Sequence, residues 1–124
     1  MTLQIFILDD LRTIKLACKD ANFKMGEGQQ YSLVRPFHFD GMKVLCDLDD
    51  ARAMIINNPP FDVWILDNDL GPGVEGYDFL KGMIAELPDK IPSIVKSCSA
   101  NYSRKVAIEA LHNDWMNFRK SDAE

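Results

Sequence analysis

The sequence is poor in cysteine and histidine and has no long apolar run. Among its 124 residues are three cysteines and two histidines. Because Cys18, Cys46 and Cys98 are odd in number and lie in apolar or helical contexts, we expect reduced thiols, as in a cytoplasmic protein. No stretch approaches the roughly 18 apolar residues that a membrane span needs, and Asp9 and Asp10 interrupt the N-terminal apolar run that a signal peptide would require. We therefore expect no membrane partner.

Positive charge is also scarce. The chain has 14 lysines and arginines against 19 acidic residues, which gives a formal net charge of −5. Since the basic residues are few and scattered, a nucleic-acid backbone is not an expected partner. The length fits one domain over residues 1–124, and a 47% hydrophobic composition is ordinary for a globular core.

The most informative stretch is the apolar run Val63 to Leu66, which ends in Asp67, Asn68 and Asp69. An unbroken run this short, with β-branched and aromatic members, predicts a strand buried on both faces at the centre of a parallel sheet. Open parallel sheets bind ligands at the C-terminal edge of their strands. The run taken alone fits a strand that simply ends in a polar turn equally well.

A second apolar run, residues 3–8, ends in Asp9 and Asp10. If the two strands are neighbours, these aspartates meet Asp67 and Asp69, and such a cluster of carboxylates is costly unless a cation neutralises it. Oxygen ligands favour Mg²⁺ or Mn²⁺. One of the first pair is alternatively expected to cap the following helix.

The rest of the chain alternates between strand and helix patterns. Residues 23–41 are left open between an extra strand and a loop, and residues 42–46 are predicted as the second core strand. Asp47 is the expected N-cap of the second helix, which stops at residues 57–60. The full prediction is strands at 3–8, 42–46, 63–66, 91–96 and 115–119, and helices at 11–22, 48–57, 76–86 and 102–112. This order predicts an α/β fold, a doubly wound parallel sheet of the flavodoxin-like (βα)5 type without its last helix.

Polar residues also follow the last two predicted strands. Ser97 and Ser99 come after the fourth strand, and Lys120 comes after the fifth. Carboxylates, a hydroxyl and a lysine at one sheet edge suit phosphoryl chemistry, in which a metal ion bridges carboxylate and phosphoryl oxygens. A carboxylate can itself be the nucleophile.

The order of these residues resembles the receiver domains of bacterial two-component response regulators, over nearly the whole chain. The resemblance implies that Asp67 accepts a phosphoryl group in a phosphorelay, and that Asp9, Asp10 and Asp67 bind Mg²⁺. It implies that Asp69 gives the metal a backbone carbonyl and that Lys120 contacts the phosphate. The implied partners are a histidine kinase or other phosphodonor and a protein that receives the output.

The family also has a serine or threonine after its fourth strand that contacts the phosphoryl group, and two residues fit this role. Ser97 keeps the family's spacing from Pro92, whereas Ser99 better matches its Ser/Thr-Ala pair, and we favour Ser99. The sequence departs from the family in two respects: Lys120 is followed by a serine where the family usually has proline, and the family's last helix is missing.

Part of the sequence also resembles a divergent receiver branch predicted to process cyclic phosphates. The motifs are residues 66–71, Leu-Asp-Asn-Asp-Leu-Gly, and residues 99–101, Ser-Ala-Asn. Asn68 and Cys98 stand where that branch has histidines. This likeness implies a metal-dependent enzyme acting on cyclic nucleotides or RNA ends, with Asn101 as a phosphate contact. The sequence thus leaves three hypotheses: a signalling receiver, the alternative enzyme, and a pseudo-receiver that binds without chemistry.

Overall fold

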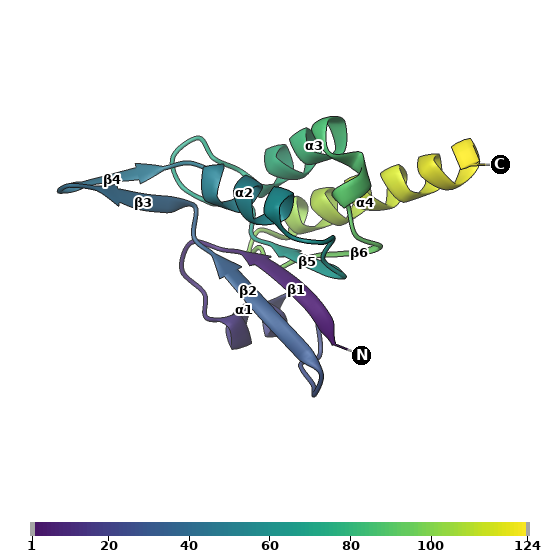
Figure 1. Cartoon of the computed structure of the whole chain (residues 1–124), viewed down its shortest axis with the longest axis horizontal. Helices are drawn as coiled ribbons and strands as arrows, with labels where there is room; N and C mark the ends of the chain where they lie inside the picture. Colours follow the sequence, from purple (N-terminus) through teal and green to yellow (C-terminus); the bar gives the residue numbers. More distant parts are fainter. Residues whose placement is uncertain (1, 124) are drawn as a thin grey trace.

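The computed structural model describes residues 2–123 and has a parallel sheet at its centre (Figure 1). Its strands run in the order β2-β1-β5-β6. Their bounds are Leu3–Leu8 for β1, Gln29–Val34 for β2, Val63–Leu66 for β5 and Ile94–Ser97 for β6. The helices are α1 (Ile14–Asp20), α2 (Asp49–Asn57), α3 (Gly76–Glu86) and α4 (Tyr102–Ala123), with a short 3-10 turn at Pro88–Lys90. This order matches the first four strands of the flavodoxin-like arrangement, so the predicted α/β class is confirmed.

The two faces of the sheet carry separate parts of the core. Alternate side chains of β1 and β5 point to opposite faces, as strand geometry requires. Phe6 and Trp64 pack in one buried cluster with residues of α2, α3 and α4, while Ile7 and Ile65 pack in the other with residues of α1. All four residues of β5 are buried, which confirms the predicted strand covered on both faces.

The second core strand is β2, so the prediction that residues 42–46 occupy that place is wrong. β2 pairs in parallel with β1 from Leu3↔Gln29 to Leu8↔Val34. Lys43–Cys46 (β4) instead pairs antiparallel with Phe37–Asp40 (β3), and Figure 1 shows this hairpin projecting from the sheet. β2 has a mixed sequence because it is an edge strand, partly exposed to solvent, and such a strand tolerates polar residues. The hairpin has the apolar residues expected of a core strand, although much of it is exposed.

The predicted fifth strand at 115–119 is also wrong, because α4 continues as one helix through those residues. Ile108, Leu111 and Trp115 keep helical spacing and pack against the core. The backbone N–H of Ser97, in edge strand β6, donates to Glu109 Oε2 of α4 at 3.0 Å. The helix thus engages the edge where a fifth strand would pair.

Lys120 therefore lies in the last turn of α4 and is exposed. Arg104 lies near the start of α4, close to the sheet edge, and Lys120 comes sixteen residues later. At 1.5 Å per residue, the two residues are about 24 Å apart along the helix axis. Figure 1 shows the end of α4 extending away from the sheet. The prediction that Lys120 joins the sheet edge is wrong, because the strand that would carry it there does not form.

The helix starts differ in detail from those predicted. The first helix begins at Ile14 rather than residue 11, and Thr13 is its N-cap, with Oγ1 accepting the N–H of Leu16 at 3.2 Å. Neither Asp9 nor Asp10 caps it. The N-cap of α2 is Leu48, while Asp47 accepts a hydrogen bond from Asp49 N. Helix α3 matches its prediction. None of the helices within residues 2–123 is both long and apolar enough to cross a membrane.

Candidate functional site

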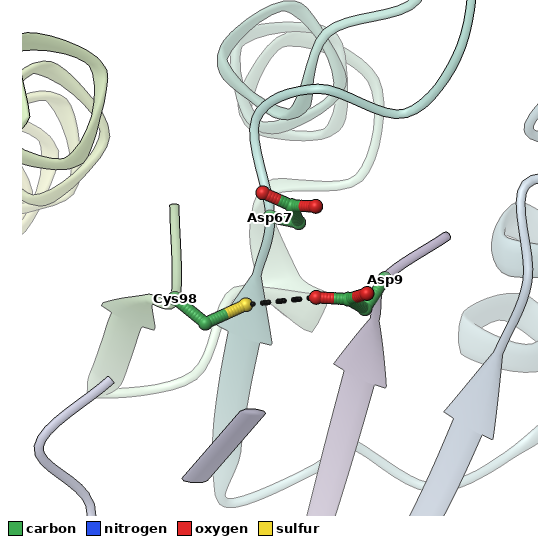
Figure 2. Close-up of side chains that lie close together, drawn as sticks. All are labelled: Asp9, Asp67 and Cys98. Carbon is green, nitrogen blue, oxygen red and sulfur yellow. Dashed lines mark hydrogen bonds between the residues drawn. The ribbon is translucent and has the colours of Figure 1, made fainter. Parts of the chain in front are cut away.

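Three side chains meet where β1, β5 and β6 end. The strand pairs Leu8↔Leu66 and Leu66↔Ser97 bring the next residues, Asp9, Asp67 and Cys98, side by side. One ligand atom from each of these three lies within 4.8 Å of the others. Figure 2 shows the Asp9 carboxylate and the Cys98 thiol pointing toward each other, with Asp67 on the strand between them. The sequence predicted that the two aspartates converge; it did not predict the cysteine.

Asp9 is the fixed anion of this cluster. It is fully buried, and Oδ1 accepts the backbone N–H groups of Leu11 at 2.8 Å and Arg12 at 2.6 Å. Its other oxygen accepts a hydrogen bond from Cys98 Sγ at 3.2 Å. Burial works to raise the pKa of Asp9, but the hydrogen bonds from Arg12, Leu11 and Cys98 outweigh it and lower the pKa below its usual value.

Asp67 lies in a different electrostatic environment. Burial and then the negative charge of Asp9 raise its pKa to about 7, although the nearby Arg12 works in the opposite direction. Its Oδ1 accepts the backbone N–H of Asn68 at 2.8 Å. Asp67 is therefore a carboxyl group whose protonation changes near neutral pH.

Arg12 carries the positive charge of the cluster. Its Nη1 lies 3.0 Å from Asp9 Oδ2 and 3.3 Å from Asp67 Oδ2, and its Nε lies 2.8 Å from Asp20 Oδ2. Sequence reasoning missed Arg12 because a basic residue in a short loop has no periodic pattern. The available indication was its position three residues after Asp9.

A cavity of about 860 Å³ opens above the cluster. Asp67 lines it, whereas Asp9 does not. The cavity wall also contains the predicted residues Asp10, Asp69, Ser99 and Asn101, together with two arginines, Arg12 and Arg104. The structure therefore brings these predicted residues to one cavity and leaves Ser97 and Lys120 out of it.

The two serines have different environments. The buried Ser97 hydroxyl donates to Leu66 O, at the end of the neighbouring strand β5, at 2.8 Å and accepts the Ser99 N–H, just after its own strand, at 3.2 Å. It therefore joins the ends of β5 and β6. Ser99 is the serine that lines the cavity. Asn101, also in the wall, caps α4 by accepting the N–H of Arg104 at 3.2 Å.

The loop after Asp67 is held tightly against the start of α3. Asn68 Oδ1 accepts the Tyr77 N–H at 3.1 Å, and Gly76 N donates to Asn68 O at 2.8 Å. A Cβ atom at Gly76 would lie 1.9 Å from the backbone oxygen of Asp67. Only glycine therefore allows this approach, which fixes the backbone beneath the Asp67 carboxyl group.

The donor set fits a hard divalent cation. Asp9 and Asp67 offer carboxylate oxygens, and Asp10 and Asp69 add further oxygens in the cavity wall. The Cys98 thiol is a poor ligand here, because burial and then the charge of Asp9 raise its pKa and keep it protonated. Asp9 and Asp67 would thus hold Mg²⁺ or Mn²⁺.

Comparison with known proteins gives one match. A family model described as the cyclic-phosphate processing receiver domain matches residues 4–114, nearly the whole chain. No curated protein and no solved structure matches the chain.

Proposed function

This chain belongs to the cyclic-phosphate processing receiver domain family, and we propose that it is a metal-dependent enzyme that opens a cyclic phosphate ester, such as a 2′,3′-cyclic nucleotide or RNA end. The observation that carries the proposal is the convergence of Asp9 and Asp67 on Arg12, with Asp67 and Arg12 in the wall of a cavity lined by charged and polar side chains. Such a site can neutralise both a divalent cation and a phosphate group.

Different residues of the site would bind the metal ion and the phosphate group. Asp9 and Asp67 would hold Mg²⁺ or Mn²⁺, which would polarise the phosphate and lower the pKa of a water molecule. Ser99, Asn101 and Arg104 lie in the wall and would hydrogen-bond phosphate oxygens. A polar cavity with cationic and hydrogen-bonding groups is the environment that a phosphate ester needs.

The reaction needs no reactant besides the cyclic phosphate and water. Water attacks phosphorus, and one P–O bond to the sugar breaks. The attacking water loses a proton, and the leaving sugar oxygen gains one, which gives a phosphomonoester beside a free hydroxyl. Asn68 and Cys98 replace the histidines of the family motifs, so the proton transfers would fall to carboxyl groups of the cavity wall other than the metal ligand Asp67.

The proposal is tested by incubating the protein with a panel of 2′,3′-cyclic nucleotides and Mg²⁺ or Mn²⁺, and by quantifying the phosphomonoester. We expect turnover that EDTA abolishes and that Asp67→Asn lowers at least about 100-fold. Asp78→Asn removes the same charge from a position outside the cavity, and it should retain wild-type turnover. No turnover of any substrate with either ion would contradict the proposal.

A second candidate function is Mg²⁺-dependent phosphorylation of Asp67 by a histidine kinase or small phosphodonor, with the signal passed to a protein partner. It is favoured by the fact that Asp67, and not Asp9, lines the cavity, where a phosphodonor can reach it. The position of Lys120 outside the site counts against it. Intact-protein mass after incubation with acetyl phosphate and Mg²⁺ tests it: a labile phosphate adduct is expected in the wild type and not in Asp67→Asn.

The non-catalytic alternative has its own outcome in these experiments. A pseudo-receiver would give neither turnover nor an adduct, and its interactions would depend on its surface.

The free cysteines Cys18, Cys46 and Cys98 support a reducing compartment, and we propose the cytoplasm for any of the three functions.

A further inference from the structure

Arg12 occupies an unusual place in the site, because one of its nitrogen atoms serves both central carboxylates. Nη1 contacts Asp9 Oδ2 and Asp67 Oδ2, while Nε is bound to Asp20 Oδ2. The side chain is mostly buried. Its charge thus neutralises carboxylates that would otherwise repel each other at close range.

The backbone around Arg12 is held as firmly as its side chain. Its N–H donates to Asp9 Oδ1, and its carbonyl oxygen accepts Arg35 Nη1 at 2.8 Å. The same Arg35 nitrogen donates to the carbonyl oxygen of Asp9 at 3.1 Å. These contacts fix the loop between β1 and α1, so the guanidinium is preorganised between the carboxylates and does not merely reach them by chance.

A divalent cation at this edge would need the oxygens that Arg12 already holds. Asp9 Oδ2 and Asp67 Oδ2 both lie within hydrogen-bond or ion-pair distance of Nη1. A guanidinium and a metal ion cannot share one carboxylate oxygen closely, because both are positive.

We propose that Arg12 is the resident cation of the site, which competes with the metal ion for Asp67 and turns to a phosphate oxygen when the ion binds. This inference rests on the metal site of the proposed function. Asp20 keeps the Nε anchor during the exchange, and Arg12 already lines the cavity. Arg12 would thereby supply the phosphate-binding charge that the sequence assigned to Lys120.

The test measures Mg²⁺ affinity by isothermal titration calorimetry, with MgCl₂ as the only ligand. Arg12→Gln should bind Mg²⁺ at least about tenfold more tightly than the wild type, because a competing unit charge is lost next to the ligand oxygens. Lys15→Gln removes the same charge from an exposed position that does not line the cavity, and its affinity should stay within about threefold of the wild type. An unchanged or weaker affinity in Arg12→Gln would overturn the proposal.

A second measurement follows inorganic phosphate on the Mg²⁺-loaded protein. Arg12→Gln should bind phosphate at least about fivefold more weakly than the wild type, and Lys15→Gln should bind it normally. Equal phosphate affinity in Arg12→Gln and the wild type would refute the phosphate-binding part of the proposal.

The folding of the variants is checked in the same buffers. If Arg12→Gln unfolds in EDTA and folds with Mg²⁺, the ion has replaced the arginine, as expected. If it unfolds in both, Arg12→Lys replaces it in the test. Lysine has one nitrogen and cannot hold Asp20 and Asp67 together, so Mg²⁺ affinity should rise at least about threefold. No rise in Arg12→Lys would overturn the proposal.

The outcomes separate this proposal from the proposed function. Turnover by the wild type with unchanged Mg²⁺ affinity in the Arg12 variants would leave the enzyme standing and reject the resident cation. Raised Mg²⁺ affinity in the Arg12 variants without any turnover by the wild type would support the resident cation and reject the enzyme.

Discussion

Replacing Gly76 with alanine should destabilise the protein strongly, because helix α3 begins directly against the backbone that carries Asp67. The new Cβ atom would lie 1.9 Å from Asp67 O and 2.9 Å from Asp67 C, inside the 3.0 Å below which such contacts essentially do not occur. These are backbone atoms and cannot rotate away. Helix α3 or the Asp67–Asn68 segment must move, and we expect a loss of at least about 3 kcal/mol in the free energy of unfolding.

Gly82 offers a matched control on the same helix. It lies inside α3, and a Cβ atom there would meet nothing within 4 Å. Gly82→Ala should therefore stabilise the protein by about 1 kcal/mol, since alanine is the better helix former. Urea unfolding followed by tryptophan fluorescence measures both variants, and Gly76→Ala should also lose turnover because Asp67 is displaced. If Gly76→Ala unfolds within about 0.5 kcal/mol of the wild type, the reasoning about this close approach is refuted.

Three further predictions concern the site and its surroundings. Lys120→Gln should leave Mg²⁺ binding and turnover unchanged, because Lys120 lies at the far end of α4; a loss of either in kinetic assays would contradict that placement. In EDTA, the contribution of Asp67 to the free energy of unfolding should fall by about 1.4 kcal/mol per pH unit between about pH 4 and 7 and then level off, because folded Asp67 holds its proton up to a pKa of about 7 and the unfolded chain does not; it is measured as the difference between the wild type and Asp67→Asn. Asp67→Asn should remove this slope in urea titrations, and an unaltered slope would assign it to another group. Ser97→Ala should cost about 1 kcal/mol, since the Leu66 carbonyl oxygen loses its hydroxyl donor and keeps only the Cys98 N–H; thermal unfolding with no loss would show that this bond contributes nothing.

The buried strands were predictable because their residues face the core on both sides. A short apolar run such as Val63 to Leu66 is typical of a strand covered on both faces, and the acidic residues that follow it mark the sheet edge. β2 was harder to predict because it is an edge strand, and its mixed residues do not form such a run. The hairpin at residues 37–46 misled the prediction, since its apolar residues are partly or fully exposed.

The C-terminal error has a different physical origin. Residues 115–119 were predicted as a strand, yet Ile108, Leu111 and Trp115 continue the helical spacing that the earlier part of α4 establishes. The spacing was the better guide, because these residues of the helix pack on the core. Extending the helix would have removed Lys120 from the predicted site.

The sequence predicted the acidic residues of the candidate site together with Ser99 and Asn101, but it did not predict the arginines or the Cys98 thiol. Asp9 and Asp67 follow directly from strands that pair in register, so their convergence depends on the sheet alone. The position of Arg12 depends on a loop conformation, which local patterns do not determine. Cys98 follows β6 as directly as Asp67 follows β5, but a thiol was not expected in a carboxylate site. Arg12 is held by Asp20, eight residues away, and such a contact becomes visible only when the helix α1 has been placed.

The most direct test of the central claim is a ³¹P NMR time course of 2′,3′-cyclic AMP with the protein and Mg²⁺ or Mn²⁺, beside Asp67→Asn. We expect the cyclic phosphate resonance to be replaced by a phosphomonoester resonance in the wild-type sample only, and EDTA should stop the conversion. If the cyclic phosphate persists unchanged with both ions while the protein remains folded, this site does not process cyclic phosphates.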